Sequence, residues 1–318
     1  MLGIYTITPL HCGTGQTAGA VDLPVAREST TGFPFIPGTA LKGVLRDTCE
    51  RREASPGPKA DCARLFGSSN GSGDGQTSPG ALAIFEGQLL ALPQRCLHAP
   101  FVYATSPLLI ERLVRTARAL GIEHPALATT VPALPEGKAV GIARQHPGTL
   151  VIEDIVFSND EILRLGPLQQ LGTFFSHLLP SEESATRERL QRDLVLLPDD
   201  TLQELASRTL PVTARTHLTP GKTTDKYADA NGKEHKGNLW YEETVPTDTL
   251  FVSYVRELPR ARGRAASSEP DASSPLSAFR ELLNQRQARV LQIGGNETVG
   301  EGYCWCQELR ELDREATP

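Results

Sequence analysis

The chain has 318 residues, enough to bury one large hydrophobic core or two small ones. Its hydrophobic content is 39%, and its apolar runs, such as ALAIF and LLALP, have the length of strands, which excludes a membrane-spanning helix of roughly 20 residues. The net charge is −6, so the surface as a whole is not basic. A nucleic-acid site would therefore depend on local clusters of lysine and arginine.

The N-terminus, MLGIYTITPL, has neither the basic stretch nor the cleavage site of a signal peptide, so we expect a cytoplasmic protein. No CxxC pair is present, and the CWC motif alternates as a strand does and lacks zinc-site spacing. We therefore expect reduced thiols in the core. The six cysteines are Cys12, Cys49, Cys62, Cys96, Cys304 and Cys306.

The N-terminal third predicts a strand, a loop, a helix and an insertion. The strand spans residues 2–10, and the loop HCGTGQTAGAVDLP that follows is too rich in glycine for regular structure. A helix then begins with Thr39 as its N-cap. Its apolar stripe consists of Leu41, Val44, Leu45, Thr48 and Cys49. Residues 54–80 are rich in Gly, Ser and Pro, which predicts a flexible insertion.

The remainder predicts further strands, three helices and a long hairpin. A strand pair is expected in ALAIFEGQLLALP, and the next helix begins at Ser106 and Pro107. A third helix carries Leu168, Leu171, Phe174, Phe175 and Leu178. Strand-like ends around a polar centre predict a hairpin over 213–251 that projects from the body.

After a flexible loop over 260–274, Pro275 starts the last helix, and the chain closes with a strand, a glycine loop and a strand. No internal repeat is visible. This mixed order of strands and helices favours an α+β fold in a single domain over residues 1–318.

Two segments have the character of phosphate-binding sites. The helix that begins GTALKGVLRD offers free N–H groups at its start and places Lys42 and Arg46 one turn apart. The loop GGNETVGEG can aim successive N–H groups at one anion, because glycine tolerates positive φ. Ordinary alternatives stay open, since a basic helix face is often only solvated and glycine turns are more often structural.

Asp22, in the segment VDLP, could hold a divalent ion through its carboxylate, although a lone loop aspartate is usually a turn former. His11 and His217 are candidate acid–base groups because histidine titrates near neutral pH. The sequence has no HExxH motif and no nucleotide-binding glycine pattern, so zinc proteases and nucleotide-cofactor enzymes have no support.

Taken in order, several motifs resemble those of the Cmr-type CRISPR backbone subunits, a Cas7-like group within the RAMP superfamily. These motifs include TPLHCGTG, VDLPVARE, GFPFIPGTALKGVLRD, CARLFG, GNLWYEETVPTDTLF and LQIGGNETVGEGY, and the match runs from Tyr5 to Tyr303. The resemblance implies a modified ferredoxin-like or RRM-like palm with insertions and a projecting β-hairpin thumb. It also implies copies stacked into a filament along a guide RNA.

The resemblance further implies that the subunit binds crRNA along its length and cleaves the complementary target RNA at regular intervals, with Mg²⁺ or Mn²⁺. Cleavage and metal binding carry over to Asp22, with His11 and Glu242 as neighbouring catalytic candidates. Guide contacts carry over to Lys42 and Arg46 in the helix. In the glycine-rich loop they carry over to Gly294, Gly295, Asn296 and Thr298.

The implied partners are crRNA, target RNA, copies of the chain itself and other subunits of the Cmr complex, with no membrane. Three alternatives remain open: a non-cleaving scaffold that binds crRNA, the sister backbone subunit of Csm-type complexes, and a small-molecule-binding α+β protein whose glycine loops clamp a ligand. Asp22 within VDLP argues against the scaffold, and the WYEE segment favours Cmr over Csm.

Overall fold

The structure is a computed structural model in which the following residues are described: 1–16, 19–53, 62–67, 79–127, 133–135, 138–142, 148–218, 222, 226–228, 234–236, 239–259, 274–284 and 289–309. Most of the expected insertion at 54–80, and all of the expected loop at 260–274 except its last residue, lie outside this set.

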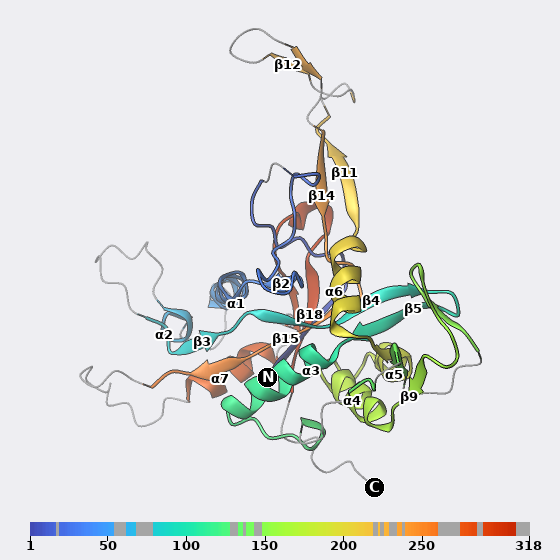
Figure 1. The fold of residues 1–318 in the computed structure, drawn as a ribbon. Coiled ribbons are helices and arrows are strands. Elements are labelled where there is room, and N and C mark those ends of the chain that lie inside the picture. Colours follow the sequence, from blue (N-terminus) through green and yellow to red (C-terminus); the bar gives the residue numbers. More distant parts are fainter. Residues whose placement is uncertain are drawn as a thin grey trace.

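Helices and strands are mixed along the chain, so the α+β class is confirmed (Figure 1). The helices are α1 (Gly38–Glu53), α2 (Cys62–Phe66), α3 (Pro107–Ala119), α4 (Gly166–His177), α5 (Ser184–Asp193), α6 (Asp199–Arg208) and α7 (Pro275–Leu283), with 3-10 turns η1 (Pro125–Leu127) and η3 (Glu297–Val299). The strands of the first half are β1 (Leu2–Thr6), β2 (Phe35–Ile36), β3 (Leu82–Ile84), β4 (Gly87–Cys96), β5 (Ala99–Thr105), β6 (Val140–Ile142), β7 (Leu150–Ile152), β8 (Ile155–Phe157) and β9 (Ile162–Arg164). Those of the second half are β10 (Leu194–Leu196), β11 (Val212–Thr216), β12 (Lys226–Ala228), β13 (Glu234–Lys236), β14 (Leu239–Glu243), β15 (Leu250–Ser253), β16 (Val255–Glu257), β17 (Val290–Gln292) and β18 (Tyr303–Glu308).

One large mixed sheet organises the fold. Its main path runs β17-β18-β1-β15-β4-β5-β10-β6-β9, and β2 and β7 also pair with β4. The pairs around β1, β15 and β4 are antiparallel, whereas β5 and β10 are parallel. The two ends of the chain therefore meet in neighbouring strands, β1 and β18, a pairing of long sequence separation.

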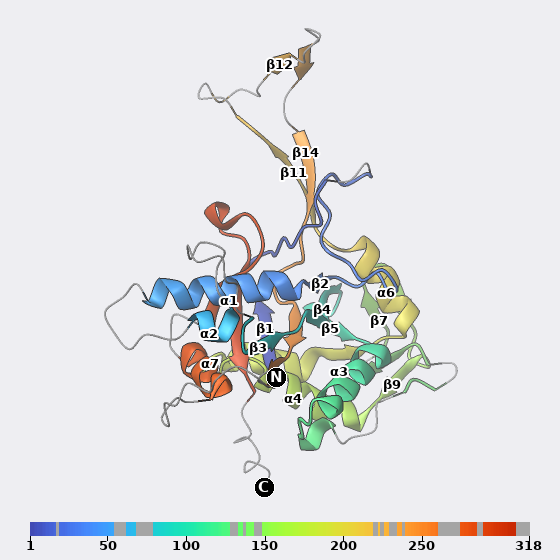
Figure 2. The same cartoon turned by 90° about the vertical axis from the view of Figure 1, so that its left-hand side faces the viewer.

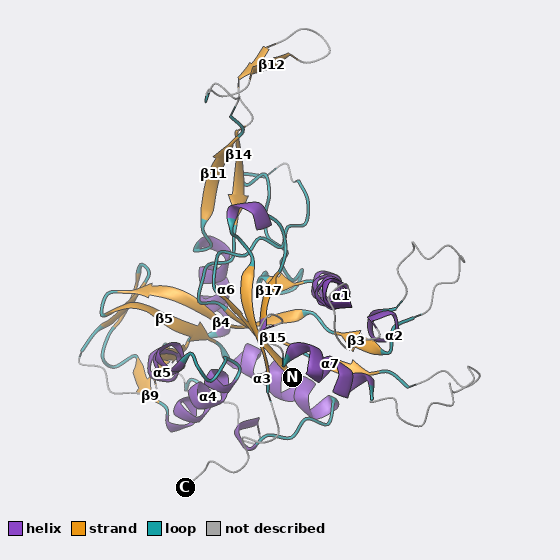
Figure 3. Cartoon of the chain, turned by 180° about the vertical axis from the view of Figure 1, so that it is seen from behind, coloured by secondary structure: helices purple, strands orange, loops and turns teal. Residues whose placement is uncertain are grey.

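The two faces of this sheet bury separate hydrophobic clusters. Along β1, Leu2 and Ile4 belong to one cluster and Tyr5 to the other, as the two-residue period of a strand requires. The first cluster also contains the apolar stripes of α1, α6 and α7, and the second those of α3 and α4. Figure 3 shows α1 and α3 on different sides of the sheet.

Three predicted details of these elements are wrong by small amounts. The first strand ends at Thr6, because residues 7–9 bend away from the sheet. Thr39 is not an N-cap but lies inside α1, which begins at Gly38. The two strands in ALAIFEGQLLALP do not pair with each other: β3 pairs with β16, and β4 pairs with β15 and β5. Pairing with distant segments decides the partners of β3 and β4, and the local pattern does not show it.

A two-stranded hairpin rises from the body of the molecule (Figures 1 and 2). Its strands β11 and β14 are antiparallel, with Ala214 opposite Tyr241. We call β11 and β14 the thumb hairpin. Beyond it β12 pairs with β13. The predicted range of 213–251 extends too far, because Leu250 and Phe251 belong to β15 in the central sheet.

Cys49 and Cys62 form a disulfide between α1 and α2, with their Cα atoms 5.9 Å apart. The expectation of reduced thiols is therefore wrong for this pair. Cys49 lies on the buried stripe of α1, and Cys62 begins the short helix packed beside it, a proximity that the spacing of the two residues does not show. The other four cysteines are free, and burial raises the pKa of Cys12 and of Cys306 to about 12.

Candidate functional site

Asp22 lies against the base of the thumb hairpin. Its Oδ2 accepts a hydrogen bond of 2.7 Å from the backbone N–H of Tyr241 in β14. The next residue, Leu23, donates its N–H to the carbonyl of Tyr241 and accepts from the N–H of Glu243, both at 3.0 Å. The loop that carries Asp22 is thus irregular, as expected, but the main-chain bonds of Leu23 attach it to β14 directly after Asp22.

One carboxylate oxygen of Asp22 stays open to a ligand. The side chain is half-buried, and within the described ranges its Oδ1 has no hydrogen-bond partner. Asp22 therefore presents a negative charge whose position is fixed by one oxygen and whose other oxygen can accept a proton or contact a cation.

His11 lies in the same region but is largely enclosed. Its Nδ1 is 2.7 Å from the backbone carbonyl oxygen of Glu243 and 3.6 Å from Oε1 of Glu242. A carbonyl oxygen only accepts, so Nδ1 carries the proton and donates it. The His11 side chain is 11% exposed, and the structure thus places it as a support for the C-terminal end of β14.

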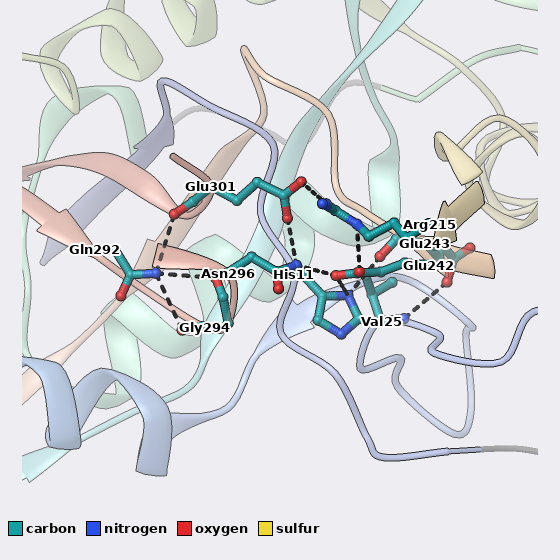
Figure 4. A network of polar contacts seen from close by, with 10 residues as sticks. His11, Val25, Arg215, Glu242, Glu243, Gln292, Gly294, Asn296 and Glu301 are labelled. Carbon is teal, nitrogen blue, oxygen red and sulfur yellow. Dashed lines mark hydrogen bonds and ion pairs between the residues drawn. The ribbon is translucent and has the colours of Figure 1, made fainter. Parts of the chain in front are cut away.

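Glu242 belongs to a buried polar network (Figure 4). Its Oε2 lies 2.7 Å from Nε of Arg215, and its Oε1 accepts a hydrogen bond from the Asn296 amide. Arg215 also pairs with Glu301, which accepts a second hydrogen bond from Asn296 at 2.8 Å. Since Glu242 is 2% exposed and both oxygens are occupied, its carboxylate faces the interior and joins the thumb hairpin to the glycine-rich loop.

The glycine-rich loop wraps around the backbone of His11. A Cβ added to Gly294, which has φ +82°, would lie 2.2 Å from the His11 carbonyl oxygen, so only glycine fits. The N–H of Gly295 donates to that same oxygen at 2.9 Å. The Gly295 N–H is therefore used within the chain and cannot bind an anion. The predicted phosphate site in this loop has one N–H donor fewer than expected. Thr298 is exposed in η3, and Asn296 adopts a left-handed conformation with φ 64°.

The two guide-contact candidates of α1, Lys42 and Arg46, are not equivalent. Arg46 donates from Nη2 to the carbonyl oxygen of Phe66 at 2.5 Å and so caps the end of α2. Lys42 is half-buried and, over the described part of the chain, has no ion-pair partner. Lys42 thus has a free charge for a phosphate, while Nη2 of Arg46 is occupied by the Phe66 carbonyl.

Four residues of this region were not among the sequence candidates: Tyr241, Glu243, Arg215 and Glu301. Arg215 and Glu301 are 86 positions apart, and the spacing of the sequence offers no signal that they meet. Glu243 is adjacent to the candidate Glu242 in WYEE, and strand alternation alone indicates that the two carboxylates face opposite ways.

The described residues do not build a resident metal site. No cluster of three or more His, Cys, Asp or Glu side chains suited to a metal ion is present in those ranges. Asp22 is a single carboxylate, so this chain alone does not fit a dedicated cage for Mg²⁺ or Mn²⁺. Nor does any described helix combine the length and apolar character needed to cross a bilayer.

The profile of the RAMP superfamily matches residues 4–305. The chain belongs to the RAMP superfamily. One RAMP relative, the CRISPR system Cmr endoribonuclease Cmr4 of Pyrococcus furiosus, is 29% identical over 305 residues, covering 95% of this chain and 93% of that protein. The predicted resemblance to Cmr-type subunits is confirmed.

Two solved structures share the fold of this RAMP protein. The crystal structure of oligomeric Cmr4 from Pyrococcus furiosus has a TM-score of 0.68 at 24% identity, covering 96% of this chain and 95% of that one. The cryo-EM structure of the type III-B Cmr-beta bound to cognate target RNA contains a chain with a TM-score of 0.68 at 20% identity, with coverage of 96% and 95%. At these identities the likeness shows the fold alone.

Proposed function

We propose that this RAMP protein is the backbone subunit of a type III-B CRISPR ribonucleoprotein, which binds crRNA and cleaves the complementary target RNA through Asp22. One observation carries the proposal: the Asp22 carboxylate is hydrogen-bonded to the strand of a hairpin that projects from the body. When such a hairpin inserts into an RNA duplex, a carboxylate held beside its strand lies next to the RNA backbone. The relative named as a Cmr endoribonuclease matches nearly the full chain, which favours cleavage over the scaffold and Cmr over the Csm alternative.

The chemistry within reach of Asp22 is attack by a ribose 2′-OH on the adjacent phosphate. The carboxylate would draw the proton from the 2′-OH through Oδ1, while the Tyr241 N–H holds Oδ2 in place. Removing this proton makes the oxygen a stronger nucleophile, and the fixed orientation of the carboxylate reduces the entropy lost at the transition state.

A divalent ion, Mg²⁺ or Mn²⁺, is part of the proposal and would arrive with the RNA. Mg²⁺ is commonly held by one or two carboxylates together with substrate phosphates and water, and Asp22 supplies the one carboxylate. When bound, the ion would neutralise charge that develops on the phosphate. Chelation with EDTA is then expected to stop cleavage while the crRNA stays bound, and cleavage that continues in EDTA would contradict metal dependence.

Lys42 and the exposed residues of the glycine-rich loop are the proposed guide contacts. Contacts of this kind read phosphates and not bases, so the subunit accepts any guide, and pairing with crRNA supplies the specificity. Copies of the chain would line up along the crRNA with the other subunits of the complex, in the cytoplasm.

Reconstitution tests this function. The chain is combined with the other complex subunits, crRNA and end-labelled target RNA, and both nuclease protection of the crRNA and target products are measured. A protected crRNA and a regular ladder of products are expected. Protection without any product would instead support the non-cleaving scaffold, and no protection would contradict RNA binding altogether.

A further inference from the structure

Glu243, at the end of β14, contacts the Asp22 loop at four points. Its N–H donates to the carbonyl of Leu23 at 3.0 Å, and its carbonyl accepts from Nδ1 of His11 at 2.7 Å. Its carboxylate accepts from the N–H of Val25 at 3.0 Å and pairs with Arg27 at 2.6 Å. These contacts bracket Asp22 in sequence, so one residue fixes the loop before and after it.

Arg27 extends this attachment into the body of the molecule. Its Nη1 donates to the carbonyl oxygen of Gly32 and to that of Ala206 in α6, both at 2.9 Å. The guanidinium thus holds the Glu243 carboxylate with one nitrogen and the palm with the other. Charge-assisted bonds are stronger than neutral ones, and the Glu243 side chain is only 9% exposed, so solvent screens this pair weakly.

Glu242 and Glu243 support the site from opposite faces of β14. Glu242 turns to Arg215 and Asn296 and so holds the glycine-rich loop. Glu243 turns the other way and holds the Asp22 loop. Because the carboxylates are adjacent on one strand, the position of β14 determines both flanks of the site together.

We propose that Glu243 is a positioning residue for target cleavage, which sets the place of the Asp22 carboxylate relative to the thumb hairpin through its bonds to Val25 and Arg27. The inference rests on the proposed function and deepens it. Its consequence is that the hairpin and the cleaving carboxylate move as one unit when the hairpin enters the guide–target duplex.

The test compares Glu243→Gln with wild type in the assembled complex under single-turnover conditions. Glutamine keeps the size and an acceptor oxygen but loses the charge that pairs with Arg27. Since misplacement by about 1 Å can cost on the order of 10²-fold in rate, we expect a loss of roughly 10- to 100-fold in the cleavage rate at saturating target. Target affinity, measured by filter binding, should change less than about twofold, because Glu243 contacts the loop and not the RNA.

The matched control is Glu153→Gln. The Glu153 side chain is 6% exposed and pairs with Arg95 at 2.5 Å, in the turn between β7 and β8, away from Asp22. The cleavage rate of the Glu153→Gln complex is expected to equal that of wild type. Should Glu243→Gln fail to fold, Arg27→Lys keeps the charge but has one nitrogen in place of the two that contact Glu243 on one side and the Gly32 and Ala206 carbonyls on the other, and the same split between rate and affinity is expected.

A Glu243→Gln complex that cuts at the wild-type rate, or one that loses affinity as much as rate, overturns the positioning role. A wild-type complex that does not cut overturns the proposed function itself. The two failures are therefore distinguishable in one set of reactions.

Discussion

The backbone N–H of Tyr241 donates a 2.7 Å hydrogen bond to Oδ2 of Asp22. This bond joins a loop near the N-terminus to a strand of the thumb hairpin more than two-thirds of the way along the chain. Its geometry requires an acceptor at Oδ2 and leaves Oδ1 available, so the contact orients the carboxylate without consuming it.

Lys42→Glu is expected to weaken crRNA loading about equally for all guide sequences and to reduce the salt slope of binding by about one, because one phosphate contact is lost. Filter binding across a series of salt concentrations measures both quantities. Arg46→Gln is the comparison. Because Arg46 caps α2 at Phe66, its main expected effect is a lower melting temperature, with a smaller effect on crRNA loading. Unchanged loading by Lys42→Glu would contradict the guide contact.

Gly294→Ala and Gly300→Ala separate steric fit from backbone strain. Both glycines have positive φ, +82° and +83°, but a Cβ at Gly294 would meet the His11 carbonyl oxygen at 2.2 Å and one at Gly300 meets nothing within 4 Å. A positive φ costs a non-glycine residue about 1–2 kcal/mol. Gly294→Ala should therefore lose clearly more unfolding free energy than Gly300→Ala in denaturant titrations. Equal losses would contradict the close packing of the glycine-rich loop on His11.

Arg215→Met leaves the buried carboxylate of Glu242 and the partly buried carboxylate of Glu301 without their shared cation. Breaking a buried pair in this way typically costs about 3–5 kcal/mol. Arg208→Met removes the more exposed pair with Asp154 and should cost clearly less, because solvent screens the two charges. Chemical denaturation of both variants tests this, and similar losses would show that the network adds little to stability.

Reduction of the Cys49–Cys62 disulfide is expected to lower the melting temperature. A cross-link that closes a loop of about 15 residues stabilises a fold by roughly 3 kcal/mol in the chain-entropy account. Thermal denaturation with and without dithiothreitol measures the effect, and Cys62→Ser should no longer respond to the reductant. A wild-type melting temperature that ignores reductant would contradict a stabilising bridge.

Four helices, α1, α3, α4 and α7, could be predicted because their signals are local, whereas α2, α5 and α6 were not predicted. Ser106 and Pro107 mark the start of α3, and the apolar stripe of α4 from Leu168 to Phe175 is buried as its spacing predicts. The thumb hairpin was predictable for the same reason, from strand-like ends around a polar centre.

The support of the site could not be predicted, because it depends on contacts between distant segments. Asn296 and Glu242 are 54 positions apart, and the role of Arg46 depends on where α2 ends. Periodicity shows that Glu242 and Glu243 face opposite ways, but it does not show what each of them meets.

The most direct test of the cleavage assignment compares wild type, Asp22→Ala and Asp22→Asn in the reconstituted complex with labelled target RNA and Mg²⁺ or Mn²⁺. Asparagine keeps an oxygen that accepts from Tyr241 but lacks the charge. The account predicts that both variants load crRNA and bind target as wild type does, while the ladder of cleavage products disappears. An unchanged ladder from either variant would contradict the assignment of cleavage to the Asp22 carboxylate.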